Sequence, residues 1–186
     1  EEVAKLRAAR RLWAGIARDR FGATKPEAMR LRFFSGCSGA TLTAQQPLNN
    51  VVRSTMQCLG AVLGGAQSIH VMGYDEAMAI PSDEAVTLAL RTQQILAHES
   101  GVANTVDPLA GSYTIETMTQ ELCNSSMTLI KEIDSKGGML ECIEKGWVQS
   151  QIMDSAYKFQ KEVENDERII VGVNDYLEDE QGKTEQ

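Results

Sequence analysis

Apolar residues follow two alternating spacings along the chain, and this alternation predicts its secondary structure. Spacings of three or four residues, as at Leu6, Ala9, Trp13 and Ile16, predict amphipathic helices. Shorter alternating or apolar runs between the helices predict strands. The predicted helices end near Gly22, Gly64, Gly101 and Gly137, and the predicted strands cover residues 29–34, 67–72 and 104–107.

The last part of the chain continues this pattern less regularly. Two further helices are predicted on either side of Trp147, followed by a late strand at 168–173. From Asp175 onward the chain is acidic, and we expect this end to be mobile.

Two helix starts carry local signals. Residues 81–84 (Pro-Ser-Asp-Glu) place proline and acids where a helix N-terminus prefers them. Asn49 or Asn50 is predicted to cap the helix that ends near Gly64.

The order helix, strand, helix, strand predicts an α/β fold with a parallel sheet. Three strands are too few to close a barrel of eight, and an open sheet would leave apolar edges exposed. The 186 residues fit one domain, but residues 1–5 read as the middle of a helix and lack the order of a secretory signal. We therefore expect an incomplete α/β domain from a longer chain. No apolar run approaches the roughly 18 residues of a membrane span.

Charge argues against some classes of partner. The net charge of −8 is unlike that of a general nucleic-acid or membrane-surface binder. Residues 1–35 nevertheless hold nine of the 18 Lys and Arg residues and only four of the 26 acids. This basic start either attracts an anionic ligand, such as a phosphate-bearing cofactor, or is an exposed helix face, which is the simpler interpretation. That face would carry Arg7, Arg10, Arg11 and Arg18.

The cysteines indicate free thiols in a cytoplasmic protein. They are widely spaced and form no Cys-x-x-Cys pair, and the chain has only two histidines, so the sequence supports no zinc site. The cysteines are Cys37, Cys58, Cys123 and Cys142.

In βα folds the ligand site lies at the carboxyl ends of the strands. This rule selects three segments: residues 35–39, 70–73 and 107–116. The first is rich in small residues (Ser-Gly-Cys-Ser-Gly) but is neither a Gly-x-Gly-x-x-Gly motif nor a phosphate-binding P-loop. A nucleotide-binding protein or a hydrolase is therefore a distant alternative.

Four side chains in these segments have alternative readings. His70 either donates a hydrogen bond or a proton, or is a structural histidine. Cys37 lacks an orienting partner at a recognisable spacing, so a nucleophilic role is poorly supported. Glu116 either places charge at a helix N-terminus or holds a ribose hydroxyl pair. Met72, unlike the other methionines, lies at a predicted strand mouth.

Read together, ordered segments of the chain resemble one family. They are EVAKLRAARRLW at 2–13, LTAQQPLNNVVR at 42–53, LGGAQSIH at 63–70, YDEA at 74–77, RTQQ at 91–94, ESG at 99–101, DP at 107–108, GSY at 111–113 and IVGVN at 170–174. The chain resembles the large subunit of adenosylcobalamin-dependent acyl-CoA mutases, the methylmalonyl-CoA mutase family. Isobutyryl- and 2-hydroxyisobutyryl-CoA mutases are relatives within it.

The resemblance implies a fold, a reaction and partners. Residues 1–118 would form the last three βα units of a (β/α)8 TIM barrel, and residues 119–186 a helical extension. Family members rearrange the carbon skeleton of an acyl-CoA by radical chemistry with adenosylcobalamin. The partners implied are the remainder of the barrel, a cobalamin-binding domain or small subunit, and further copies in an oligomer. The segment by itself is expected to be inactive.

The resemblance also implies roles for single residues. His70 is expected to be catalytic and Gln67 to lie with it beside the junction of cofactor and substrate. Ser112 and Glu116 are expected near the adenosyl group. The substrate side would be shaped by Arg32, Ser35, Cys37 and Met72.

Two strand mouths depart from the family pattern. Phe34-Ser35-Gly36-Cys37 stands where relatives usually have a His-Thr-Gln-Thr-like run, and His70-Val71-Met72 stands where they usually have His-Thr-Asn. We expect a pocket for an acyl group that is less polar or bulkier than methylmalonyl. The same departures leave open a non-catalytic paralogue or assembly subunit.

Overall fold

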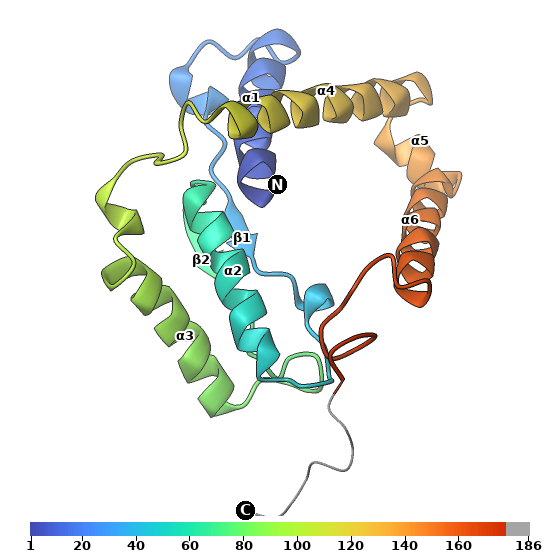
Figure 1. The fold of residues 1–186 in the computed structure, drawn as a ribbon. Coiled ribbons are helices and arrows are strands. Elements are labelled where there is room, and N and C mark those ends of the chain that lie inside the picture. The colour runs from blue at the N-terminus through green and yellow to red at the C-terminus, as the bar shows by residue number, and fades with distance from the viewer. Residues whose placement is uncertain (178–186) are drawn as a thin grey trace, which may run out of the picture. The chain divides into compact units, whose positions relative to one another are not determined.

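The computed structural model describes residues 1–177 (Figure 1). The chain divides into two compact units, residues 1–128 and residues 129–186, and each is described by itself. The predicted boundary between 118 and 119 stays a prediction. No helix of the described part is both long enough and apolar enough to cross a membrane.

The first unit is built on two parallel strands. β1 (Phe34–Gly36) pairs with β2 (Ser68–His70), with Phe34 opposite Ser68 and Gly36 opposite His70. The helix α2 (Asn49–Leu63) connects the strands, and α3 (Asp83–His98) follows β2 and packs beside α2 (Figure 1). This is the βα arrangement that the apolar pattern predicts, with two strands in place of three.

The core of this unit lies between the strands and the two helices. It contains the buried side chains of Cys37, Cys58, Val71, Ala89 and Leu96. Small residues fill much of it, so α2 and α3 approach the sheet closely and any added volume would force a shift.

The helix α1 (Glu2–Asp19) packs against α2 through a glycine. A Cβ added at Gly64 would lie 3.1 Å from Leu6 Cβ and 3.0 Å from the Gly60 carbonyl oxygen, so a larger residue would push the two helices apart. The helix α4 (Tyr113–Ser135) crosses α1 (Figure 1), and the Cys123 thiol lies 3.7 Å from the carbonyl oxygen of Ala8. The predicted helices that end near Gly22 and near Gly137 are both confirmed, as α1 and α4.

Two of the predicted strands in the first unit need correction. Residues 26–29 form a short 3-10 helix and only Phe34 of the predicted strand 29–34 pairs, because its partner β2 begins at Ser68. The predicted strand 104–107 is wrong: residues 102–104 form a 3-10 helix, and Asp107 has a φ of +48°, which no strand accepts. A third short 3-10 helix is Gly39–Thr41.

The second unit contains the end of α4, then α5 (Met139–Glu144) and α6 (Trp147–Glu164). Two helices after α4 are confirmed, although Trp147 begins α6 instead of separating it from α5. The late strand predicted at 168–173 is wrong. A turn forms there, with a single bridge between Val171 and Asp175 and with Gly172 at a φ of +78°. The acidic end predicted to be mobile lies mostly outside the described residues.

Large apolar side chains remain exposed on the sheet and helices of the first unit. They include Phe34, Val52, Met56, Val86 and Leu90. A two-stranded parallel sheet with one face uncovered is not a complete core, since parallel sheets are normally covered on both faces. The fold is therefore a mostly helical α/β part of a larger domain.

Candidate functional site

The two strands present one covered face and one open face. Ser35 and Ile69 are half-buried on the helix side, and Ile69 packs against the core. Phe34 and His70 are exposed on the other side, and their rings stack with centroids 6.5 Å apart and planes 24° apart. The open face thus carries the imidazole of His70, at the carboxyl end of β2, beside the aromatic ring of Phe34, the first residue of β1.

His70 also lines a small cavity at the carboxyl end of β2. The cavity has a volume of about 100 Å³, and its polar lining comes from His70, Glu76 and Gln93. Glu76 Oε2 accepts a hydrogen bond of 3.2 Å from the backbone N–H of Gly73. Glu76 and Gln93 were missed by the sequence reasoning, although Glu76 follows the strand mouth by only a few residues.

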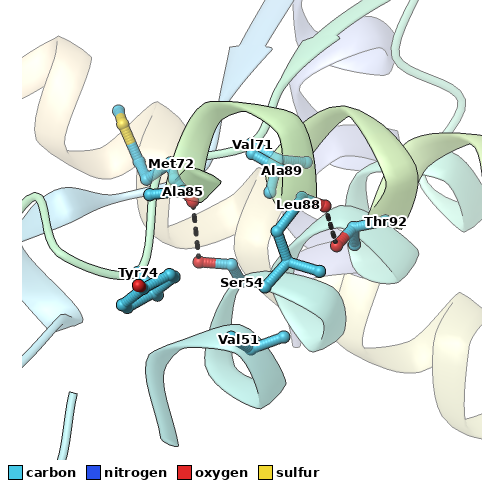
Figure 2. A pocket seen from close by; sticks show the side chains of 9 residues that line it. All are labelled: Val51, Ser54, Val71, Met72, Tyr74, Ala85, Leu88, Ala89 and Thr92. Carbon is cyan, nitrogen blue, oxygen red and sulfur yellow. Dashed lines mark hydrogen bonds between the residues drawn. The ribbon is translucent and has the colours of Figure 1, made fainter. Parts of the chain in front are cut away.

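Met72 borders a second, small space between α2, the end of β2 and α3. Figure 2 shows nine side chains around it, with Ser54 Oγ donating to the Met72 carbonyl at 3.4 Å and Thr92 Oγ1 donating to the Leu88 carbonyl at 2.9 Å. Its volume is about 10 Å³, room for about one water molecule. This space is a packing defect and holds no substrate.

The loop after β1 lines a larger cavity of about 320 Å³. Ser35, Cys37 and Ser38 lie on one side of it, and the first turns of α1 lie on the other. Gln57 of α2 holds the loop, because its Oε1 accepts from the Ser38 N–H at 2.6 Å and its Nε2 donates to Thr41 Oγ1 at 2.6 Å. The glycine-rich loop is therefore tied to α2.

The Cys37 thiol belongs to the core. Its side chain is 4% exposed, and Sγ lies 3.9 Å from the Ser54 carbonyl oxygen. Burial, together with the nearby Cys58 thiol, raises the pKa of Cys37 to about 11. A thiol of this kind is protonated at neutral pH and is not a nucleophile.

We expect Cys37 to resist alkylation in the folded protein. Burial disfavours the thiolate, so at pH 8 iodoacetamide is expected to modify Cys37 at least about tenfold more slowly than after denaturation in urea. Mass spectrometry of the peptide containing Cys37 measures the difference. Equal labelling in folded and unfolded protein would contradict the buried environment.

Gln67 lies at the amino end of β2, away from the strand mouths. Its Oε1 accepts from the Phe33 N–H at 3.0 Å, and its Nε2 donates to the Gly65 carbonyl at 2.9 Å. Both ends of the amide therefore bridge the segments that lead into the strands. Arg32 is exposed and precedes β1.

Asn50 is a buried residue that the sequence reasoning placed wrongly. Asn49 and Asn50 both lie inside α2, and the residue before them, Leu48, makes no side-chain cap. Asn50 is fully buried: Oδ1 accepts from the Thr43 N–H at 3.1 Å and from Arg53 at 2.8 Å. Its Nδ2 donates to the Thr43 and Tyr74 carbonyls, each at 2.8 Å. Asn50 thus joins the loops after β1 and β2.

A separate group of charges joins α1 to the segment before α4. Arg7, whose side chain is 14% exposed, donates to Asp107 Oδ2 at 2.5 Å and to Glu116 Oε1 at 2.6 Å. Glu116 Oε1 also accepts from the Gly111 N–H at 3.2 Å. Ser112 lies in the same turn, where its carbonyl accepts from the Glu116 N–H at 2.9 Å.

Arg10, one helical turn after Arg7, connects α1 to the turn that precedes β2. It donates to the Gly64 carbonyl in the turn that precedes β2, and burial lowers its pKa. The expected exposed arginine face is therefore wrong for Arg7 and Arg10, whereas Arg11 and Arg18 are exposed. His70, at the carboxyl end of β2, lies outside this group.

The predicted site residues thus lie in separate places in the structure. Ser35 and Cys37 share the cavity after β1, His70 lies on the open face with Phe34, and Glu116 and Ser112 form the separate group around Arg7. Within residues 1–177, no three His, Cys, Asp or Glu side chains are arranged to hold a metal ion. All four cysteines are free and buried.

Known proteins match the whole chain. The family model for methylmalonyl-CoA mutase covers residues 1–186. The chain is 50% identical to the 2-hydroxyisobutanoyl-CoA mutase large subunit of Aquincola tertiaricarbonis, over 97% of the chain and 32% of that protein. It is 45% identical to the methylmalonyl-CoA mutase of Rhizobium meliloti, over 97% of the chain and 25% of that protein. The corresponding protein of Escherichia coli is 43% identical over 98% of the chain and 26% of its own length. The chain therefore spans between a quarter and a third of these relatives.

Proposed function

The chain belongs to the methylmalonyl-CoA mutase family, and from this premise we propose that it is part of the catalytic subunit of an adenosylcobalamin-dependent acyl-CoA mutase. The reaction is the carbon-skeleton isomerisation of an acyl-CoA. The observation that carries the proposal is the family match along the entire chain, together with an exposed imidazole at the carboxyl end of two parallel strands. In βα folds that end of the sheet is where ligands bind.

We propose that β1–α2 and β2–α3 are consecutive units of a (β/α)8 barrel. Residues 1–118 belong to the barrel in this proposal, and residues 119–186 form a helical extension. The uncovered face of the strands supports it, because the exposed rings of Phe34 and His70 would then face the barrel interior.

His70 is the proposed catalytic residue. Its ring is exposed on the open face and is oriented by the stack with Phe34. An imidazole there can donate a hydrogen bond to the thioester carbonyl of the substrate and stabilise negative charge that develops on the oxygen. Arg32, Ser35, Cys37 and Met72 are proposed on the substrate side, with Cys37 acting through the shape of the loop because its thiol is buried.

Two carboxylates of the described chain, Glu76 and Glu116, fit a ribose-bearing cofactor, whereas both ends of the Gln67 amide are already bonded to the backbone. Ribose hydroxyls need acceptors with free lone pairs. Glu76 has one oxygen held by a backbone N–H, and Glu116 has one held by a backbone N–H and by Arg7, while the other oxygen of each has no partner among residues 1–177. We propose Ser112, Glu116 and Gln67 as cofactor-binding residues, with Glu76 as an addition that its place beside His70 supports. When bound, adenosylcobalamin supplies the radical that starts the rearrangement.

The proposed partners follow from the size of the relatives. Two of them are named large subunits, of 2-hydroxyisobutanoyl-CoA mutase and of methylmalonyl-CoA mutase. We propose that this chain works with the remainder of the barrel, with a cobalamin-binding domain or small subunit, and in an oligomer.

Turnover by the complete protein tests the proposal. The full-length protein, with its cobalamin-binding domain or subunit, is incubated with adenosylcobalamin and a panel of acyl-CoAs, and the isomeric products are measured by mass spectrometry. We expect isomerisation of at least one branched acyl-CoA, with uncharged acyl groups preferred. A protein that binds acyl-CoA but isomerises none would overturn the proposal in favour of the non-catalytic paralogue.

A further inference from the structure

Phe34 is an aromatic side chain that the core of the protein does not use. It is 61% exposed, and its ring lies on the open face of the sheet, against the imidazole of His70. Exposed aromatic rings beside a candidate site commonly contact a ligand, since they bury a large apolar area with few internal rotations.

Gly36 determines where this ring lies. It stands opposite His70 in the strand register and has no side chain to cover the sheet there. A Cβ added at Gly36 would lie 3.3 Å from Phe34 Cε1, a tight contact that the ring would have to shift to relieve. The ring therefore extends along β1 over Gly36, and the space beside His70 is bounded by an apolar wall.

The two strands supply little to bind an anion. Residues 34–36 and 68–70 are Phe-Ser-Gly and Ser-Ile-His, so the imidazole is the sole titratable side chain in either strand. A carboxylate placed against the Phe34 ring would lose its hydration and gain no salt bridge from either strand, since Arg32, the cation proposed on the substrate side, precedes β1. An alkyl group in the same place would gain contact area instead.

We propose that Phe34 is a specificity-determining residue that selects an uncharged, branched acyl-CoA over an acyl-CoA carrying a second carboxylate. Gly36 contributes to this selectivity because it has no side chain that would displace the Phe34 ring. This inference rests on the proposed mutase function and adds the substrate class and the residue that sets it.

The test compares two substrates in the complete enzyme with its cobalamin partner. The ratio of kcat/KM for isobutyryl-CoA to that for methylmalonyl-CoA is measured in the wild type, Phe34→His, Phe34→Ala and Phe34→Leu. We expect the wild type to favour the uncharged substrate by about tenfold or more, and Phe34→His to move the ratio at least about tenfold toward methylmalonyl-CoA. Phe34→Leu keeps an apolar wall and is expected to keep most of the preference. Phe34→Ala provides the same comparison if the histidine variant does not fold.

A binding measurement tests the contact between Phe34 and the acyl group independently of turnover. Calorimetry without cobalamin is expected to show that Phe34→Ala weakens isobutyryl-CoA binding by about tenfold and leaves coenzyme A itself unaffected. Phe21→Ala is the matched control, since Phe21 is 72% exposed just after α1 and lies outside both strands. It is expected to change neither the ratio nor the affinity.

The possible failures are distinguishable. If the wild type isomerises no acyl-CoA, the proposed function is wrong. If it isomerises them but prefers methylmalonyl-CoA, or if Phe34→His and Phe34→Ala give the ratio of Phe21→Ala, the mutase function stands and the role of Phe34 is overturned.

Discussion

Replacing Asn50 by alanine is expected to destabilise the first unit by about 2–4 kcal/mol, the largest effect that we expect from a single substitution in its core. The amide of Asn50 makes four hydrogen bonds, to the N–H and carbonyl of Thr43, the carbonyl of Tyr74 and the guanidinium of Arg53. Asn50 is 0% exposed, so water does not replace those bonds when the amide is removed. Buried backbone groups without partners carry their full desolvation cost.

Hydrogen exchange in the complete protein measures this effect locally. The peptides covering 42–50 and 72–76 are expected to exchange faster in Asn50→Ala, because both loops lose the residue that joins them to α2. Asn50→Asp is expected to be at least as unstable as Asn50→Ala, since an oxygen would then face two carbonyl oxygens. Asn49→Ala is the control: Asn49 is half-buried and donates to Gln46 Oε1 at 2.8 Å, so the expected loss is below about 1 kcal/mol. Equal exchange in the Asn49 and Asn50 variants would contradict the role of Asn50.

Elements with local causes were predicted from the sequence. The start of α3 is one example: Ser82 Oγ accepts from the Ala85 N–H at 3.2 Å, and acids occupy the first turn. Every group in that cap lies within a few residues, so the sequence contains the whole interaction. The placement of His70 at a strand end was predictable for a similar reason, because the apolar run and the following glycine mark that end.

Strands were predicted less well because a strand needs a partner. Residues 29–33 alternate like a strand, yet they have no pairing segment in the described chain, and pairing begins only at Phe34. At residues 104–107 the backbone of Asp107 turns into the left-handed region instead. Alternation indicates a surface that suits a sheet, but the neighbouring chain decides whether the sheet forms.

The contacts around the candidate site were not predictable, because their partners are far apart in the sequence. Arg7 and Glu116 are 109 positions apart, and Asn50 and Tyr74 are 24 apart. Arginine in a helix and asparagine near a helix start have common local interpretations, an exposed face and a cap. In this fold Arg7 and Asn50 make tertiary contacts instead, so neither local interpretation holds. Glu76 was missed although it follows His70 closely, because the cavity that both residues line is completed by the distant helix α3.

Replacing His70 by alanine is expected to lower kcat by about 10²–10⁴-fold in the complete, cofactor-loaded enzyme, the largest effect that we expect on activity. The imidazole is exposed on the open face, stacks on Phe34 and borders the cavity that contains Glu76. Since the ring lies outside the core, its removal is expected to leave the fold and the affinity for coenzyme A nearly unchanged, and kcat to fall more than KM changes. Isothermal titration with acyl-CoA and steady-state kinetics measure the two quantities separately.

Two further variants determine what the imidazole contributes. His70→Gln keeps a hydrogen-bond donor but cannot take up or release a proton near neutral pH. A kcat above that of His70→Ala would therefore indicate hydrogen bonding, and a kcat equal to it would indicate proton transfer. His98→Ala is the matched control, because His98 is exposed at the last turn of α3, where it interacts with the helix dipole. It is expected to keep kcat within about twofold of the wild type, as exposed substitutions away from a site usually do. If His70→Ala behaves like His98→Ala, the imidazole at the end of β2 has no part in the reaction, and a catalytic role has to be sought among residues of the longer protein.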